Sequence, residues 1–166
     1  WNSSSGLWQV AKSTGSSFTA PTTWHAGFGA GQTPLMGDFN GDQRLDAGAV
    51  SGGTWTIALS TGTGFGSPTS WLSGFGSGAT PLTGDFNGDG LTDVAAASGG
   101  TLSVALSDGR RLVSQPTAWT TGFGAGQTVT SADLNGDGLT DVLYYDKATG
   151  AVVAAYSTGQ GFGTAQ

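Results

Sequence analysis

Three acidic loops hold most of the charged side chains in this chain. They read GDFNGDQRLD at residues 37–46, GDFNGDGLTD at 84–93 and ADLNGDGLTD at 132–141, and they contain nine of the eleven aspartates. Counted from its first aspartate, each loop places side-chain oxygens at positions 1, 3, 5 and 9. Alternate oxygens of this kind, with a backbone carbonyl at position 7, suit Ca²⁺, which takes about six to eight oxygen ligands. The loops therefore predict three calcium sites.

The predicted calcium ligands occupy the same five positions in every loop. Positions 1, 3, 5 and 9 contribute side-chain oxygens, and position 7 contributes its backbone carbonyl. In chain order the predicted sets are Asp38, Asn40, Asp42, Arg44 and Asp46; Asp85, Asn87, Asp89, Leu91 and Asp93; and Asp133, Asn135, Asp137, Leu139 and Asp141. Three Ca²⁺ would neutralise a chain whose formal charge is −6.

Asp, Asn and Gly also form turns without a metal, because they bond the local backbone and tolerate left-handed conformations. Three copies in register favour the metal interpretation, because clustered carboxylates repel one another unless a cation lies between them. The loops are not EF-hands, which carry a bidentate Glu at position 12, where this chain has Ala49, Ala96 and Tyr144. Magnesium demands tighter octahedral geometry and zinc prefers His or Cys, so Ca²⁺ is the predicted ion.

The first loop departs from the other two at positions 6 and 7. Gly90 and Gly138 stand at position 6 of the second and third loops, whereas the first loop has Gln43 there, followed by Arg44. A left-handed backbone conformation costs a non-glycine residue about 1 kcal/mol. We therefore predict that the first site is the weakest of the three.

The loops belong to a longer internal repeat. Their first aspartates are 47 and 48 residues apart, and a recurring tryptophan and a recurring phenylalanine keep the same two intervals: Trp24, Trp71 and Trp119; Phe28, Phe75 and Phe123. Residues 7–53, 54–100 and 101–150 align along their whole length, and 151–166 is a partial repeat. We interpret residues 1–166 as a single repeat domain.

Within a repeat, apolar residues alternate with a period of two. In TWTIALS, Trp55, Ile57 and Leu59 share one face, which is the pattern of a half-buried strand. DVAAAS and the extended stretches around FGSPTSW and TPLTGDF bring the count to about four strands per repeat. This pattern predicts an all-β fold of β-propeller blades, which are four-stranded antiparallel sheets that stack on their neighbours. An internally duplicated β-sandwich is the alternative.

The pairing of GFGAGQTP with GDFNGDQRLD, and of GFGSGATP with GDFNGDGLTD, resembles the FG-GAP repeat, also described as the VCBS repeat. The resemblance covers nearly the whole chain, although the third copy, GQTVTSADLNGD, lacks the proline and the glycine of the other two. It implies blades of an integrin-like β-propeller with one calcium loop in each blade. Such propellers usually close with about seven blades.

The chain has about three full repeats with partial ones at both ends, which leaves three interpretations open. The first is a protomer that completes a ring by self-association, for example as a dimer. The second is an excerpt of a longer chain, and the third is an open arc with capped ends. An open arc would expose strand edges and an apolar face, which tend to pair with another chain. We therefore expect a homo-oligomer or the remainder of a longer chain as the partner.

Composition excludes several classes of protein. Five Lys and Arg residues in a chain of net charge −6 make no basic patch for nucleic acid. No apolar run approaches the ~20 residues of a membrane span. The absence of cysteine excludes a disulfide framework and a thiolate metal site. The chain begins at Trp1 without a methionine, which we interpret as a removed signal or an excerpt. Accessible loops suit extracellular calcium, so we expect a secreted protein.

A binding module is the favoured function, most simply a carbohydrate-binding, lectin-like one or an appendage of a secreted enzyme. Aromatic rings stack on sugars, so Trp24, Trp71 and Trp119 are candidate ligand-binding residues. Packing as wedges between adjacent blades is the other interpretation, and it is the one we favour for each of these tryptophans. Trp8 and Trp55 lie on the apolar face of a strand, and we expect them in the core.

The alternative function is a protein-interaction or adhesion scaffold, with contacts from the variable segments SDGRRLVSQ and YYDKATG. Arg110 and Arg111 form the only basic pair, and solvation is the simplest role for it. We do not expect an enzyme, because the chain has one histidine, His25, and no cysteine or glutamate, and calcium activates water weakly. Asp108 and Asp146 are expected to be solvated turn residues.

Overall fold

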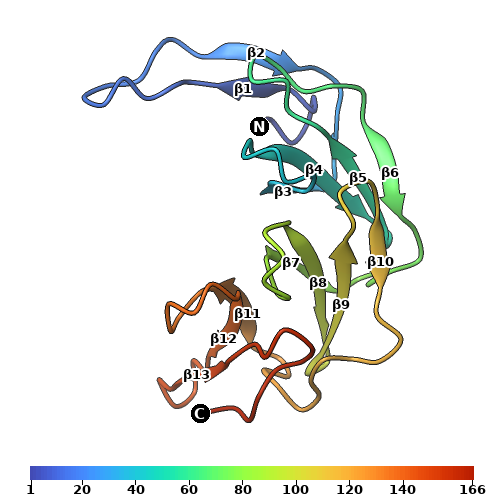
Figure 1. The fold of residues 1–166 in the computed structure, drawn as a ribbon, viewed down its shortest axis with the longest axis vertical. Coiled ribbons are helices and arrows are strands. Elements are labelled where there is room, and N and C mark those ends of the chain that lie inside the picture. Colours follow the sequence, from blue (N-terminus) through green and yellow to red (C-terminus); the bar gives the residue numbers. More distant parts are fainter.

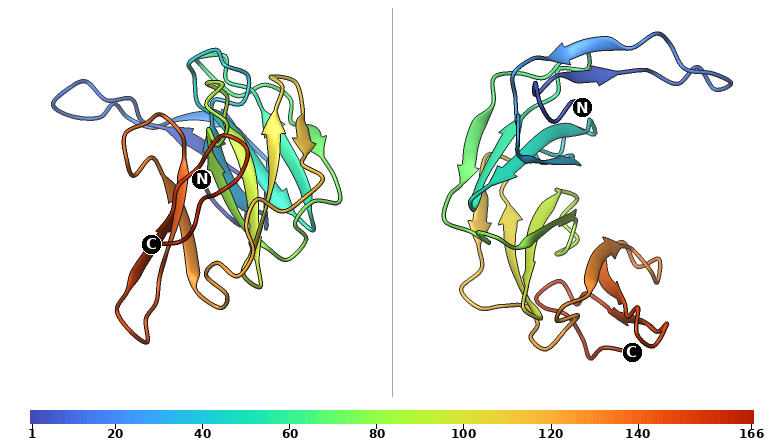
Figure 2. Two further views of the ribbon diagram at one scale, coloured as in Figure 1. Left: turned by 60° about the horizontal axis from the view of Figure 1, so that its bottom comes forward. Right: turned by 180° about the vertical axis from the view of Figure 1, so that it is seen from behind.

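The computed structural model describes residues 1–166 and contains thirteen β-strands and no helix. The strands form four separate antiparallel sheets that follow one another along a curved arc (Figure 1). Viewed from behind, the arc is open on one side, and the two chain termini lie toward its opposite ends (Figure 2). The all-β fold with stacked antiparallel blades is therefore confirmed. No helix is present that could cross a membrane.

Two sheets have four strands each, and their strands are ordered as in the sequence. Blade 1 consists of β3 (Thr33–Gly37), β4 (Asp46–Ser51), β5 (Thr54–Ala58) and β6 (Thr69–Leu72). Blade 2 consists of β7 (Thr80–Gly84), β8 (Asp93–Ser98), β9 (Thr101–Ser107) and β10 (Leu112–Ser114). The acidic loops connect the first and second strands of their blades. They end at Asp46 and Asp93, which open β4 and β8.

The two outer sheets are smaller. The half-blade consists of β1 (Trp8–Val10) and β2 (Thr22–His25), which correspond to β5 and β6 of blade 1. Blade 3 consists of β11 (Thr128–Ala132), β12 (Asp141–Tyr145) and β13 (Val152–Ala155). Gln166 adds a further extended segment to this blade, because it exchanges two backbone hydrogen bonds with Ala154, of 2.9 and 3.0 Å. The strand before the third acidic loop forms even without the proline of the other repeats.

Each 47-residue repeat of the sequence contributes two strands to one blade and two to the next. Residues 54–100, for example, contain β5 and β6 of blade 1 followed by β7 and β8 of blade 2. The repeat therefore ties neighbouring blades together covalently, and it gives each blade boundary equivalent residue positions.

The apolar cores lie between the blades. In β5, Trp55 and Ile57 are 1% exposed while the alternate threonines are half-buried, as the period of two predicts. Small residues of β8 allow close packing on this surface, so that Val94 and Ala96 join a cluster with Trp55 and Phe39 of blade 1. A second cluster joins blades 2 and 3 in the same way. Each blade is thus stabilised by burial against its neighbours, as in other repeat proteins.

Candidate functional site

The three acidic loops share one backbone course. A glycine with positive φ stands at position 4 of each, at Gly41, Gly88 and Gly136, with φ between 77° and 79°. Position 6 also has positive φ in every loop, including Gln43, whose φ of 66° makes it the one non-glycine residue of the chain in this conformation. The strain predicted for the first loop is therefore present in its backbone.

Side-chain oxygens at positions 1, 3 and 5 accept hydrogen bonds from the loop's own backbone. In the second loop, Asp85 Oδ1 accepts from Gly88 N at 2.7 Å and its Oδ2 from Gly90 N at 2.8 Å. Asp89 Oδ1 accepts from Leu91 N at 2.9 Å, and its Oδ2 accepts from the amide of Asn87, also at 2.9 Å. The first and third loops repeat these bonds. The predicted ligands at these positions therefore lie together in one loop.

The aspartate at position 9 is directed away from the loop surface and into the blade. Asp46, Asp93 and Asp141 are fully buried. Asp93 Oδ2 accepts from Phe86 N at 3.0 Å, and its Oδ1 accepts from Ser107 N at 2.8 Å. The carboxylate thus joins the acidic loop to the third strand of its own blade. No lysine or arginine forms an ion pair with any of the three.

Burial shifts the acidity of these groups. Desolvation raises the pKa of Asp93 to about 7, against two backbone hydrogen bonds that lower it. Desolvation also raises the pKa of Asp46. A buried carboxylate that lacks a cation is costly, and proteins commonly resolve the cost by pairing, by metal coordination or by protonation.

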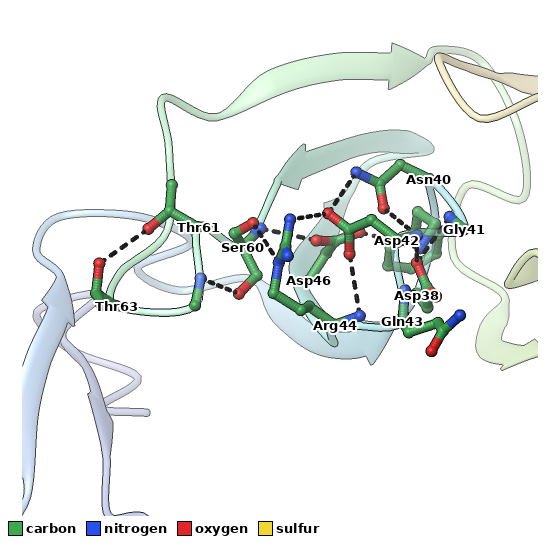
Figure 3. A network of polar contacts seen from close by, with 12 residues as sticks. Asp38, Asn40, Gly41, Asp42, Gln43, Arg44, Asp46, Ser60, Thr61 and Thr63 are labelled. Atoms are coloured by element: carbon green, nitrogen blue, oxygen red, sulfur yellow. Dashed lines mark hydrogen bonds and ion pairs between the residues drawn. The ribbon is translucent and has the colours of Figure 1, made fainter.

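In the first loop, the side chain of an arginine from the loop itself pairs with one of the predicted ligands. Arg44 Nη2 lies 2.6 Å from Asp42 Oδ2, and Arg44 Nε donates to Ser60 O at 3.3 Å (Figure 3). Asn40 Nδ2 donates to the same Asp42 oxygen at 3.0 Å, and this bond is the largest influence that lowers the pKa of Asp42. The guanidinium therefore competes with any metal for the position 5 carboxylate of this loop alone.

The donor chemistry of the loops fits a hard cation. Every predicted ligand is an oxygen, and an ionised carboxylate offers about four acceptor sites, more than the backbone bonds consume. However, nowhere do three acidic or histidine side chains converge into a metal cluster. Calcium at the second loop would compete with Asn87 for the oxygen of Asp89 that now accepts its amide.

The recurring tryptophans lie in the packing between blades. Trp71 is buried and packs edge-on against Phe39, with ring centroids 6.3 Å apart. Trp24 and Trp119 are half-buried and pack edge-on against Phe65 and Phe162, at 5.1 and 5.5 Å. The ring of Trp71 is therefore closed to a sugar. Trp8 and Trp55 are buried in the core, as expected.

Two equivalent crevices lie at the blade boundaries, and the sequence reasoning missed them. One lies between blades 1 and 2, with a volume of about 230 Å³, and the other between blades 2 and 3, with about 320 Å³. Ten of the eleven lining residues of each occupy equivalent repeat positions. The polar side chains are Gln32, Thr33 and Ser51 in the first crevice and Thr80, Ser98 and Gln127 in the second.

Glycines form much of the remaining wall of both crevices. Gly76 and Gly124 have positive φ, and a Cβ on Gly124 would lie 3.0 Å from Val129 Cγ2. The signal in the sequence was the repeated pairing of SGG with GSGAT or GAGQT. In isolation, each of these segments is typical of a turn. Only the folded structure brings them together at a blade boundary.

Three further polar residues, His25, Asp108 and Asp146, contact residues close to them in the chain. The only histidine, His25, packs edge-on against Phe28, and its Nδ1 is buried without a hydrogen-bond partner. Asp108 accepts from Arg110 N and pairs with Arg111 Nε at 2.9 Å. Asp146 closes a turn by accepting from Thr149 Oγ1 at 2.7 Å.

Comparisons with known proteins agree with the repeat pattern. A family profile described as FG-GAP-like repeat matches residues 38–96 and 85–144, and each match spans two acidic loops. No curated protein sequence matches the chain.

Two solved structures share the fold. A lectin of Agrocybe aegerita, described as recognising non-reducing terminal N-acetylglucosamine, superimposes with a TM-score of 0.70 and 21% identity over 95% of this chain and 45% of the lectin. A mutant Tc holotoxin pore of Photorhabdus luminescens superimposes with a TM-score of 0.66 and 18% identity over 89% of this chain and 8% of the toxin chain. The chain thus spans less than half of either protein.

Proposed function

Because the chain belongs to the FG-GAP-like repeat family, we propose that it is a secreted glycan-binding module whose blades are stabilised by Ca²⁺ and which catalyses no reaction. The observation that carries this proposal is the pair of equivalent crevices at the blade boundaries. The same polar crevice at two blade boundaries would give the chain two sites for the same sugar.

The crevices offer the groups that sugar hydroxyls need. Ser51 and Ser98 end β4 and β8 with exposed side chains, beside Thr33 and Thr80 of the neighbouring strands. Glycine backbone supplies N–H and C=O groups without side chains in front of them. The smaller crevice lies below the range of small-ligand sites, about 300–1,000 Å³, and the larger one lies at its lower end, which suits a single terminal sugar. Two such sites on one rigid arc would gain affinity for a branched glycan through avidity.

Terminal N-acetylglucosamine is the first ligand to test, because a lectin with this fold is described as recognising it. Calorimetry with an oligosaccharide ending in this sugar should give two sites per chain. Ser51→Tyr and Ser98→Tyr each fill one crevice and should each halve the stoichiometry, and the double variant should lose binding.

Ser114→Tyr is the matched control, because Ser114 is exposed on β10 and lines neither crevice. It should bind as the unmodified chain does, and all variants should melt within a few degrees of it. Unchanged binding by the double variant would contradict the crevices as sites. Absence of binding to any glycan would instead favour an adhesion scaffold, the alternative function, which would use exposed segments such as the one around Arg110.

Calcium would act on the fold rather than on the ligand. Asp85, Asn87 and Asp89 would hold the ion in the second loop, with Asp93 behind them, and the other loops would repeat this set. A metal that binds the folded chain and not the unfolded one stabilises the fold by mass action. The ion would compensate the negative charge of the loop carboxylates. The chain's own residues would form the binding crevices between the blades that the ion stabilises.

A further inference from the structure

The two blade-boundary crevices differ in where they carry a side-chain amide. Gln127 lines the second crevice from blade 3, and the equivalent place in the first crevice is held by Ala79 of blade 2. The first crevice has a glutamine as well, Gln32, but it belongs to blade 1. In the second crevice the position equivalent to Gln32 falls to Ala79, which does not line it. The two crevices therefore carry their amides on opposite walls.

An aspartate of blade 3 holds the amide of Gln127 in one orientation. Gln127 Nε2 donates to Asp146 Oδ1 at 3.3 Å. The carboxylate is itself fixed, because Ala148 N donates to Oδ1 at 2.9 Å and Thr149 Oγ1 donates to Oδ2 at 2.7 Å. These bonds hold the pKa of Asp146 below its usual range, with the bond from Thr149 as the largest influence. Asp146 is thus an ionised acceptor for the nitrogen end of the glutamine.

Blade 1 lacks this support for its own glutamine. Ser51 stands at the position of Asp146, so the equivalent pair in blade 1 is Gln32 and Ser51. No hydrogen bond joins these two side chains, whereas Gln127 and Asp146 are joined. Either end of the Gln32 amide can therefore turn toward the first crevice. Only the second crevice has an amide with a set direction.

The fixed direction leaves a single acceptor in the second crevice. Gln127 is half-buried, and its Oε1 accepts no hydrogen bond from the protein. The opposite wall, from blade 2, offers the exposed hydroxyls of Thr80 and Ser98, which can donate. Phe123 and Val129 add apolar surface on the wall of blade 3. An acceptor with apolar neighbours thus stands on one wall, and hydroxyl donors stand on the other.

We propose that Gln127 makes the second crevice selective for an N-acetylated sugar, with Asp146 as the residue that positions it. This inference rests on the glycan-binding function proposed above. The acetamido N–H donates to Gln127 Oε1, its C=O accepts from a hydroxyl of the blade 2 wall, and its methyl contacts the apolar surface. A sugar hydroxyl at the same carbon has one oxygen in place of these groups and no methyl, so that it matches fewer of them.

The test uses two chains that each keep one crevice open. Ser51→Tyr fills the first crevice and leaves the second, and Ser98→Tyr does the reverse. Calorimetry with the methyl glycosides of N-acetylglucosamine and of glucose gives the ratio of their dissociation constants in each chain. We expect the Ser51→Tyr chain to prefer the N-acetyl sugar by about tenfold or more, and the Ser98→Tyr chain by less than about threefold.

Further substitutions in the Ser51→Tyr chain locate the selectivity. Gln127→Met keeps the length of the side chain without its amide, and it should remove the preference while both sugars still bind. Asp146→Ala should lower the preference, and Asp146→Asn should retain it, because the asparagine carbonyl still accepts from Gln127 Nε2. Gln115→Ala is the matched control and should change nothing. Gln115 is also half-buried and donates its amide to a nearby oxygen, Val113 O at 3.2 Å, but it lines neither crevice.

The outcomes separate this inference from glycan binding itself. A preference that survives Gln127→Met, or an equal preference in the Ser51→Tyr and Ser98→Tyr chains, would overturn the selectivity and leave the crevices as sugar sites. Failure of the unmodified chain to bind either glycoside would refute both proposals.

Nuclear magnetic resonance of the unmodified chain gives a second measurement, which does not depend on the folding of any variant. The side-chain amide signals of Gln127 should shift when the N-acetyl glycoside is added, and much less with the glucoside. Equal shifts with the two glycosides, or no shift with either while calorimetry shows binding, would overturn the role of Gln127.

Discussion

The hydroxyl of Ser107 donates a 2.7 Å hydrogen bond to the carbonyl oxygen of Phe39, which lies 68 residues earlier in the chain. The two residues belong to different blades, and both are buried. The same serine's backbone N–H donates to Asp93, so that one residue joins the acidic loop of its own blade to the acidic loop of the preceding one. Ser157 repeats this arrangement with Phe86 and Asp141.

Ser107→Ala should therefore weaken the contact between blades 1 and 2. A buried acceptor left without its donor costs about 1–3 kcal/mol, and we expect a loss of this size in the free energy of unfolding. Ser60→Ala is the matched control, because Ser60 makes the same local bonds to Asp46 and Gly62 but donates to no neighbouring blade. Chemical unfolding should show the smaller loss for Ser60→Ala, and equal losses would contradict the role given to the inter-blade bond.

Gly84 faces the next blade, and its replacement should open the boundary between blades 2 and 3. A Cβ there would overlap Thr140, and the φ of Gly84 is not positive, so the effect of Gly84→Ala would come from overpacking rather than from backbone strain. Overpacking of this kind costs about 1–3 kcal/mol. Ala132 occupies the equivalent position of blade 3, and it is exposed. The reverse change Ala132→Gly should alter the thermal midpoint little, and a loss equal to that of Gly84→Ala would argue against the steric account.

The local sequence pattern was sufficient to predict the blades. The alternation of apolar residues and the repeat of 47 residues can both be recognised without knowing which distant residues are in contact. Trp55 and Ile57 are buried as that period requires. The repeat also predicted which residues gather in each acidic loop. What it did not predict is the orientation of Asp93, whose two oxygens accept backbone hydrogen bonds inside the blade. That orientation depends on Ser107 of the third strand, and no local motif relates the two residues.

The crevices and the burial of the tryptophans likewise depend on contacts that the local sequence pattern does not specify. Trp71 shares its repeat position with Trp24, yet it is the more deeply buried, because blade boundaries differ in what covers them. The crevice residue Ser51 and the glycine Gly76 are separated by 25 residues and meet only when two blades stack. Sites built from two neighbouring repeats depend on this stacking, which a single repeat does not encode.

Gln43→Gly should strengthen the first acidic loop. Gln43 has a φ of 66°, and glycine accepts this conformation without the cost of about 1 kcal/mol that a side chain carries. We expect a gain of that order in the free energy of unfolding and tighter calcium binding by the first loop, measured by calorimetric titration. Gly90→Gln in the second loop is the reciprocal change and should weaken its site. Three equal calcium affinities in the unmodified chain would contradict the ranking of the sites.

Arg44→Leu gives the first loop the residue of the other two at position 7. It frees Asp42 from the ion pair at 2.6 Å, so the pKa of Asp42 should rise and the loop should lose its internal competitor for a metal. We expect calcium to raise the thermal midpoint of this variant more than that of the unmodified chain. Arg110→Leu removes a cation from an exposed turn instead, and the calcium-dependent shift should stay unchanged in it.

The buried carboxylate of Asp93 should make stability depend on pH when calcium is absent. Its pKa is about 7 in the folded chain and near 3.8 when exposed, so between these values the folded state holds a proton that the unfolded state releases. The free energy of unfolding should therefore fall as pH rises from 5 to 7, by at most about 1.4 kcal/mol per unit from this group. Urea unfolding in chelator measures the slope, and Asp93→Asn should reduce it. Calcium favours the ionised carboxylate, so saturating calcium should flatten the slope in the unmodified chain. An identical slope in Asp93→Asn would show that another group is responsible.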